Sequence, residues 1–328
     1  MTRRLTKSWG EPVAGSPQLL VKQSRSGADT CSEVSESPSG GHFLRSQLLT
    51  IAHEPLQARY ERPSGGGSLL ATNLDHQKLG RAQKDQLCGA FWGSLTLSAA
   101  GHPTSQEEVA VRAGTTLAEG DPAGWLPPGA SPRTDYEAAI PVAAAGVSAG
   151  TSATGVARSI EELSGGTLAV VPVAGPWRAR TVVSLVEIAA EAPGCVLIAN
   201  LRSGHLWGSR PPARLLLDYL QGRPVGVPPP DWDCGHFLTI AACVGGPGGV
   251  LVVLRDTYPQ LGWNGYHLQP AVVVAAALVR GDGHEGGVLC ACEALAAEAL
   301  ARRVGKAGFE VRSWDNGSPD GGGETRAG

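Results

Sequence analysis

The chain has 328 residues, 42% of them hydrophobic and 17% charged, so it is long and apolar enough to bury a core. A formal net charge of -3 gives no basic excess, which argues against nucleic acid or an anionic membrane surface as a partner. The basic N-terminal residues are not followed by an apolar run, and no segment is apolar enough to span a membrane, so we expect a cytoplasmic protein.

The two ends of the chain differ in composition from its centre. Residues 1–42 are rich in Ser, Gly, Thr and charged residues without periodicity, which predicts a disordered N-terminal extension. Residues 43–67 suggest a short amphipathic helix and a Gly/Ser-rich link. We place the folded domain at 68–313 and a disordered tail at 314–328.

Between these ends, helical patterns dominate first and strand patterns later. Apolar spacing and helix-start and helix-stop residues predict helices over 88–100, 104–114, 178–191, 213–221, 270–280 and 293–308. Strands are predicted over 195–200, 236–244, 250–258 and 287–292. This order predicts an α+β architecture and not a doubly wound parallel sheet.

The clearest strand signal is a hairpin, HFLTIAACV and VLVVLRDTY around GGPGG. If the five residues between the runs form the turn, Val244 faces Val250 and His236 lies opposite Tyr258. Residues two apart in a strand share a face, so His236 and Asp256 would project to the same side as diagonal neighbours. A one-residue slip in register would separate them.

Seven cysteines form an odd, scattered set, unlike a disulfide scaffold, so we expect mostly reduced thiols. Two spacings suggest metal ligands, the CxC pair Cys290 and Cys292, and Cys234 two residues before His236. Neither matches the CxxC spacing of zinc ribbons or fingers, and we expect neither a metal nor a cofactor.

Cys88 follows a polar lead-in and starts an apolar helical segment, CGAFWGSLTLSAA. A helix N-terminus favours the thiolate, the nucleophilic form of cysteine, and Gly89 leaves space for a substrate backbone. A thiolate catalyst also needs an imidazole that shares its proton and an acceptor that orients the imidazole. His236 and Asp256 on the predicted hairpin could fill these roles.

A Gln, a Cys–Gly pair at a helix start, GHF on a strand and an Asp on the next strand together resemble the papain-like cysteine peptidases that remove double-glycine leaders from bacteriocin precursors. The resemblance spans roughly residues 75–293. It implies a helical subdomain that carries the nucleophile and an antiparallel sheet subdomain that carries His and Asp. It further implies Cys88 as nucleophile, His236 as general base, Asp256 as its orienting residue and Gln83 as part of the oxyanion hole.

The chain departs from the family pattern at three points. Leu87 and Thr257 stand where the family usually has Asp and Pro, and a longer interval between Cys88 and His236 implies an insertion.

Other residues compete for the site or could line it. Cys234 in DCGH imitates the family's nucleophile motif, but a proline-rich loop precedes it and a strand follows it. His267 is a plausible pocket residue close after Asp256. The residues that we predict for substrate binding are Gly89, Trp92, His205, Trp207, Gly235 and Trp263.

The sequence therefore predicts a cofactor-free cysteine peptidase acting on a peptide or precursor peptide, in natural-product maturation in a bacterium. Two alternatives remain open: an enzyme that cyclises a peptide or transfers an acyl group on the same scaffold, and a peptide-binding module without catalysis.

Overall fold

The computed structural model describes residues 69, 73, 77, 83–121, 125–144 and 148–320, all within the unit Gly40–Gly328. In this part of the chain the fold is α+β, as expected. The predictions for residues 1–42 and 43–67, and for residues 321–328 of the tail, concern positions outside the described residues. Among the described residues, none of the helices has both the length and the apolar character needed to cross a membrane.

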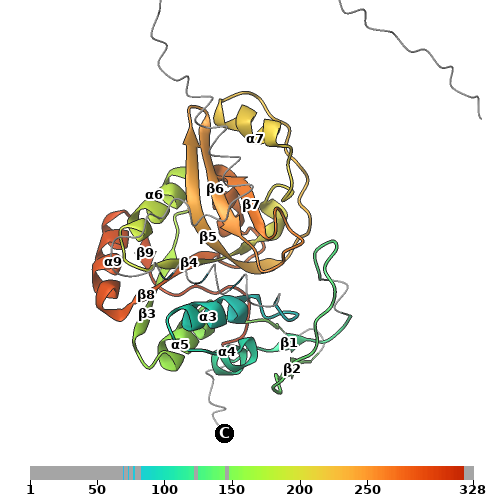
Figure 1. Cartoon of the computed structure of the whole chain (residues 1–328), viewed down its shortest axis with the longest axis vertical. Helices are drawn as coiled ribbons and strands as arrows, with labels where there is room; N and C mark the ends of the chain where they lie inside the picture. Colours follow the sequence, from blue (N-terminus) through green and yellow to red (C-terminus); the bar gives the residue numbers. More distant parts are fainter. Residues whose placement is uncertain are drawn as a thin grey trace, which may run out of the picture. The chain divides into compact units, whose positions relative to one another are not determined.

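An antiparallel sheet of seven strands runs through the described part of the chain (Figure 1). Its order is β7-β6-β5-β4-β8-β3-β9. The strands are β3 (Leu168–Ala174), β4 (Val196–Arg202), β5 (Gly235–Gly246), β6 (Gly249–Arg255), β7 (Tyr266–Pro270), β8 (Gly287–Glu293) and β9 (Glu310–Val311). Two short strands, β1 (Leu117–Ala118) and β2 (Val142–Ala143), pair separately and in parallel.

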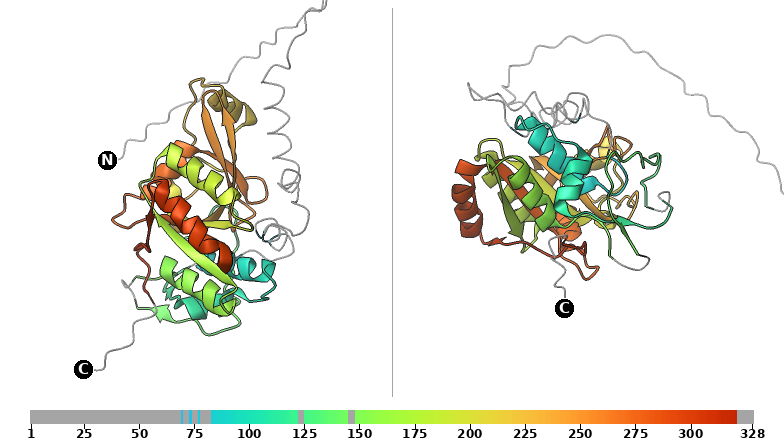
Figure 2. Two further views of the ribbon diagram at one scale, coloured as in Figure 1. Left: turned by 90° about the vertical axis from the view of Figure 1, so that its left-hand side faces the viewer. Right: turned by 90° about the horizontal axis from the view of Figure 1, so that it is seen from below.

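Helices cover both faces of this sheet (Figure 2). On one face the core is built with α6 (Ala179–Ala190), α8 (Ala271–Val279) and α9 (Ala294–Lys306). On the other it is built with α3 (Cys88–Ala99), α4 (Gln106–Ala113) and α5 (Ala153–Leu163). A smaller cluster joins α7 (Ala213–Leu220) to β5, β6 and β7, and a single 3-10 turn, η3 (Ser203–His205), follows β4.

The alternation of side chains along β4 explains why helices are needed on both sides. Val196 and Ile198 pack toward α3–α5, whereas Leu197 and Ala199 pack toward α6, α8 and α9. A strand that is apolar at consecutive positions must be covered on both faces.

The helix predictions that fall on described residues agree with the structure to within a few residues. The Ser105 side chain caps α4 by accepting a hydrogen bond from the Glu108 N–H, and Gly114 ends that helix in the left-handed conformation. The predicted strands also form, as β4, β5, β6 and β8.

Three elements longer than three residues were not predicted, α5, β3 and β7, and neither were the short β1, β2, β9 and η3. The start of α5 lies in a segment of small residues, where a capping Ser152 is the main signal. Because β3 lies near the middle of the chain and in the sheet between β8 and β9, the expectation of helices first and strands later is too simple.

The hairpin turn is also shorter than predicted. Gly246 pairs with Gly249, so Pro247 and Gly248 alone form the turn, and Val244 faces Leu251 instead of Val250. A bulge between Ile240 and Ala242 then shifts the register by one residue.

Beyond that bulge the strands pair as predicted. Thr239 faces Arg255 and Ile240 faces Leu254, which is the register expected from a five-residue turn without a bulge. The shorter turn and the bulge cancel, and His236 and Asp256 remain on the same side of the sheet.

The folded structure continues past residue 313, the end that the sequence predicts for the domain. Trp314 is buried and packs on the backbone at Gly287, where an added Cβ would lie 2.6 Å from the indole ring. Asn316 is also buried, and its amide donates a hydrogen bond to the Thr151 carbonyl at 3.0 Å. A composition rich in Gly, Ser and Asp hid these two anchors.

Candidate active site

Cys88 is the first residue of α3, and a tight turn precedes it. The Leu87 N–H donates to the Lys84 carbonyl at 3.1 Å, and Gln86 adopts a left-handed backbone with φ 62°. The Gln86 side chain bonds both the N–H and the carbonyl of Ala118, which ties this turn to β1. The hydrogen bonds of residues 84–87 therefore fix the position of the Cys88 thiol at the start of α3.

A buried ion pair connects the segment before Cys88 to α4. The Lys84 ammonium contacts the Glu107 carboxylate, and both side chains are almost completely buried. Although burial opposes it, the hydrogen bond from Lys84 and further donors lower the pKa of Glu107. The pair connects the position of Cys88 to the packing of the helical layer formed by α3, α4 and α5.

His236 lies near the start of β5, where it pairs with Leu201 of β4. Its side chain is 2% exposed, and its Nε2 atom lies 3.1 Å from Asp256 Oδ1. The ring of Trp232 meets the imidazole edge-on at 5.1 Å, and the Tyr258 ring stacks on it at 6.1 Å. These contacts leave the ring little freedom to turn.

Asp256 follows β6 and is also buried. Besides His236, its Oδ1 atom accepts hydrogen bonds from the Tyr258 N–H at 3.0 Å and the Thr257 hydroxyl at 3.3 Å. Thr257, which stands where the resembling family has Pro, thus adds a donor to the carboxylate.

The charges of His236 and Asp256 support each other. Burial alone would lower the pKa of His236, but Asp256 and Cys88 outweigh it and raise this pKa to about 10. Burial would likewise raise the pKa of Asp256, but the two neighbouring histidines, His236 and His267, hold it well below its ordinary value. Both shifts favour the ion pair of an imidazolium and a carboxylate.

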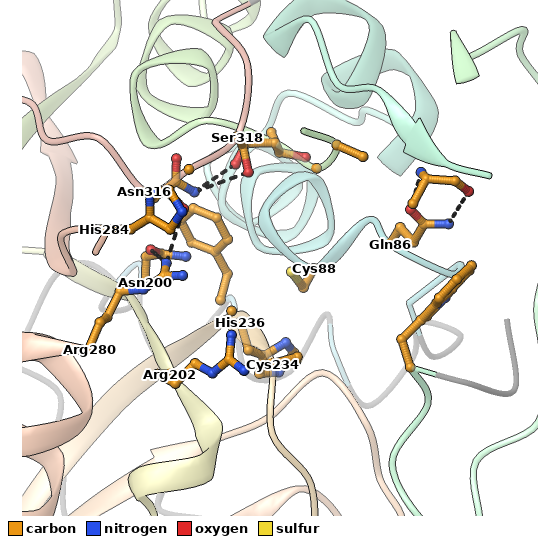
Figure 3. Close-up of a pocket in the computed structure, with 18 of the residues that line it drawn as sticks. Gln86, Cys88, Asn200, Arg202, Cys234, His236, Arg280, His284, Asn316 and Ser318 are labelled. Carbon is orange, nitrogen blue, oxygen red and sulfur yellow. Dashed lines mark hydrogen bonds between the residues drawn. The ribbon is translucent and has the colours of Figure 1, made fainter. Parts of the chain in front are cut away.

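Cys88 and His236 line one cavity of about 480 Å³ (Figure 3). The other residues that line it are Gln83, Gln86, Ala118, Trp125, Ala149, Gly150, Thr151, Asn200, Arg202, Trp232, Cys234, Gly235, Phe237, Tyr258, Arg280, Asp282, His284, Asn316, Gly317 and Ser318. The cavity therefore lies where the helical layer, the sheet and residues 316–318 meet.

Two further predicted residues, Gln83 and Gly235, belong to this lining. The Gln83 amide nitrogen donates to the Tyr258 hydroxyl at 2.7 Å, and its oxygen has no hydrogen-bond partner in the described part of the chain. An amide nitrogen carries two protons, so one remains for a substrate oxygen.

Gly89 and Trp92 lie outside the cavity lining, contrary to expectation. A Cβ at Gly89 would lie 2.9 Å from Val156 and 3.1 Å from the Phe237 ring, so this glycine allows α3 to approach α5 and β5. Trp92 is fully buried in the core of the helical layer. Both residues serve packing, because the helix presents them to its neighbours and not to the cavity.

The other three predicted substrate-binding residues also lie away from the cavity lining. The His205 ring bonds the Arg280 carbonyl at 2.5 Å, and Trp207 is buried with its ring 5.8 Å from that of Tyr219. Trp263 packs on the cluster around α7. Closeness to a motif in the sequence did not show which way these side chains face.

The cavity also has a polar wall that the sequence pattern does not predict. Asp282 accepts two hydrogen bonds from Arg280 and one from Arg202, which also forms a bidentate pair with Asp233. Arg280, at the end of α8, has a positive φ of 69° combined with a ψ of -63°. A positive φ is uncommon in residues other than glycine, and nothing in the sequence pattern predicts it at this arginine.

Cys234, the competing nucleophile, also lines the cavity but is not equivalent to Cys88. It follows a loop, and its sulfur lies 3.9 Å from the Ser203 hydroxyl. Burial, together with the charge of Cys88, raises the pKa of Cys234 well above that of a free thiol. Its environment therefore disfavours the thiolate.

An α+β scaffold that brings a helix-start cysteine and a histidine to one cavity, with an aspartate bonded to that histidine, defines a candidate thiol site. The chain belongs to a family of unknown function, DUF6885, whose model matches residues 69–315. This range contains Cys88, His236 and Asp256. No curated protein and no solved structure matches the chain.

Proposed function

We propose that the protein is a papain-like cysteine peptidase that cleaves a peptide amide bond with Cys88, His236 and Asp256. The observation that carries the proposal is that His236 lines the same cavity as Cys88 while its Nε2 atom contacts Asp256 at 3.1 Å. The nucleophile comes from the helical layer and its partners from the sheet, which is the division of roles in papain-like enzymes.

The chemistry follows from these positions. The Cys88 thiolate attacks the substrate carbonyl carbon, and the negative charge that develops on the oxygen is stabilised by the Gln83 amide and the backbone N–H of Cys88. His236 gives its proton to the departing amine as the C–N bond breaks, which leaves a thioester on Cys88. His236 then removes a proton from water, the resulting hydroxide attacks the thioester carbon, and cleavage of the C–S bond releases the acid and restores the Cys88 thiolate beside protonated His236.

A mass-resolved peptide library tests the reaction. We expect pairs of products whose masses sum to the substrate plus one water. Cys88→Ala should abolish them, whereas Cys243→Ala, which changes a thiol outside the cavity, should not.

Other outcomes of the same experiment would replace the proposal. A cyclic product and a released fragment whose masses sum to the substrate without added water would indicate cyclisation, and a product joined to a second amine would indicate acyl transfer. Peptides that bind equally to wild type and Cys88→Ala without any product would indicate a binding module.

A further inference from the structure

We propose that His267 is a positioning residue of this site, which holds the Asp256 carboxylate in the orientation that serves His236. The inference rests on the proposed function. His267 Nε2 lies 3.8 Å from Asp256 Oδ2, whereas His236 Nε2 lies 3.1 Å from Oδ1. The carboxylate thus stands between two imidazoles, and all three side chains are at most 3% exposed.

The register of the sheet explains this second contact. β7 pairs with β6 so that His267 faces Leu254, two residues before Asp256. Residues two apart share a face of a strand, so His267 and Asp256 are diagonal neighbours across β6 and β7. His236 reaches the same carboxylate from the opposite neighbour, β5.

A buried amide determines how the His267 ring carries its proton. Gln269 is fully buried, its oxygen accepts from the Trp207 N–H at 2.8 Å, and its nitrogen donates to the Trp207 carbonyl at 2.9 Å. These two bonds to a backbone fix which end of the amide is nitrogen. The same nitrogen lies 3.1 Å from His267 Nδ1.

His267 Nδ1 is therefore the acceptor of this bond. In the neutral ring the proton must then be on Nε2, the atom that faces Asp256. Nε2 has no hydrogen-bond partner among the described residues. A separation of 3.8 Å is longer than a hydrogen bond, so the N–H acts on the carboxylate as an oriented dipole that a small shift would convert into a direct bond.

The two carboxylate oxygens consequently have different neighbours. Oδ1 accepts from His236, Thr257 and Tyr258, whereas Oδ2 faces His267. Removal of the His267 N–H would leave Oδ2 without this dipole in a buried place, and the carboxylate could turn away from His236 or take up a proton.

Alkylation of Cys88 by iodoacetamide between pH 5 and 9, followed by peptide mass, tests the proposal without a known substrate. His267→Gln keeps an N–H donor, and we expect a rate within about threefold of wild type. His267→Leu removes it, and we expect a loss of about tenfold near neutral pH with a displaced pH profile, as when an orienting group is disturbed. His102→Leu, a histidine change on a different part of the molecule, is the matched control and should leave the profile unchanged.

Equal rates and profiles for His267→Leu and wild type would overturn the positioning role. If His267→Leu fails to fold, ¹⁵N NMR of the wild-type imidazoles decides, because the proposal requires the Nε2–H tautomer of His267, and an Nδ1–H tautomer contradicts it. If Cys88 of the wild type is not the fastest thiol, the peptidase proposal fails instead, and the NMR result still judges His267 separately.

Discussion

The His236–Asp256 pair makes the stability of the protein depend on pH in a defined direction. The pKa of His236 is raised to about 10 in the folded protein, against an ordinary value near 6.5. A raised pKa stabilises the fold fully below about pH 6.5, and this stabilisation is lost as the pH rises through about 10. The pKa of Asp256 is lowered, so its contribution is present above its ordinary pKa of 3.8 and is lost as the pH falls further.

Asp256→Asn tests this charge pairing. Near pH 7 we expect the free energy of unfolding to fall by about 3 to 5 kcal/mol, because one partner of a buried ion pair is removed. The difference from wild type should shrink as the pH rises through 10, where His236 loses its charge. Urea unfolding at pH 7 and pH 10 measures both values, and an equal difference at the two pH values would contradict the assigned charges.

At the scale of single residues, the sequence predicted the parts of the site that depend on local pattern. A helix start placed Cys88, and strand alternation placed His236 and Asp256 together. It failed for Trp92 and Trp207, because an aromatic residue near a motif can face either the core or the cavity, and only the packed structure distinguishes them.

The element that positions the nucleophile, α3, depends on its close approach to α5 and β5. Gly89→Ala would place a Cβ 2.9 Å from Val156 and 3.1 Å from Phe237, so we expect a loss of stability of about 1 to 3 kcal/mol from overpacking, and slower alkylation of Cys88. Gly305→Ala in α9 is the control: its Cβ would meet no atom within 4 Å, and alanine should stabilise that helix by up to about 1 kcal/mol. Thermal unfolding compares the two, and an unchanged or raised melting temperature for Gly89→Ala would show that the approach is not tight.

In the β5–β6 hairpin, strand patterns predicted the two strands and the turn but not the bulge. The two apolar runs predicted β5 and β6, and GGPGG located the turn between them. Alternation could not reveal the bulge, because Ala241 and Ala242 both pack toward the cluster around α7 and small residues give no periodic signal. The predicted neighbours His236 and Asp256 meet because the turn and bulge offset each other.

At the scale of the whole molecule, residues 314–318 stabilise the described fold by packing against elements that are distant in sequence. Trp314 packs in the core of the helical layer, and Asn316, Gly317 and Ser318 line the cavity. Trp314→Ala should therefore lower the free energy of unfolding by about 3 to 5 kcal/mol. Leu295→Ala, at a side chain that is 98% exposed, should change it by less than about 0.5 kcal/mol. Similar values for the two variants in urea unfolding would show that the segment does not support the fold.

At the scale of the molecule, composition and helix and strand patterns predicted the α+β class. They did not predict the seven-strand order or the helices on both faces, because both depend on β3, which joins the sheet between β8 and β9 far from its neighbours in sequence. The polar wall of the cavity was missed for the same reason, since Asn200, Arg280 and Asn316 meet only when distant segments fold together.

The most direct test of the central claim is a comparison of alkylation rates among the cysteines at pH 6.5. Burial raises the pKa of the thiols at Cys234, Cys243 and Cys292, in the last two to about 12, so these should react slowly. We predict that iodoacetamide labels Cys88 first, and that His236→Gln slows this labelling at least tenfold while the other rates stay unchanged. Labelling of Cys234 as fast as Cys88, or a Cys88 rate that does not respond to His236→Gln, would contradict the account.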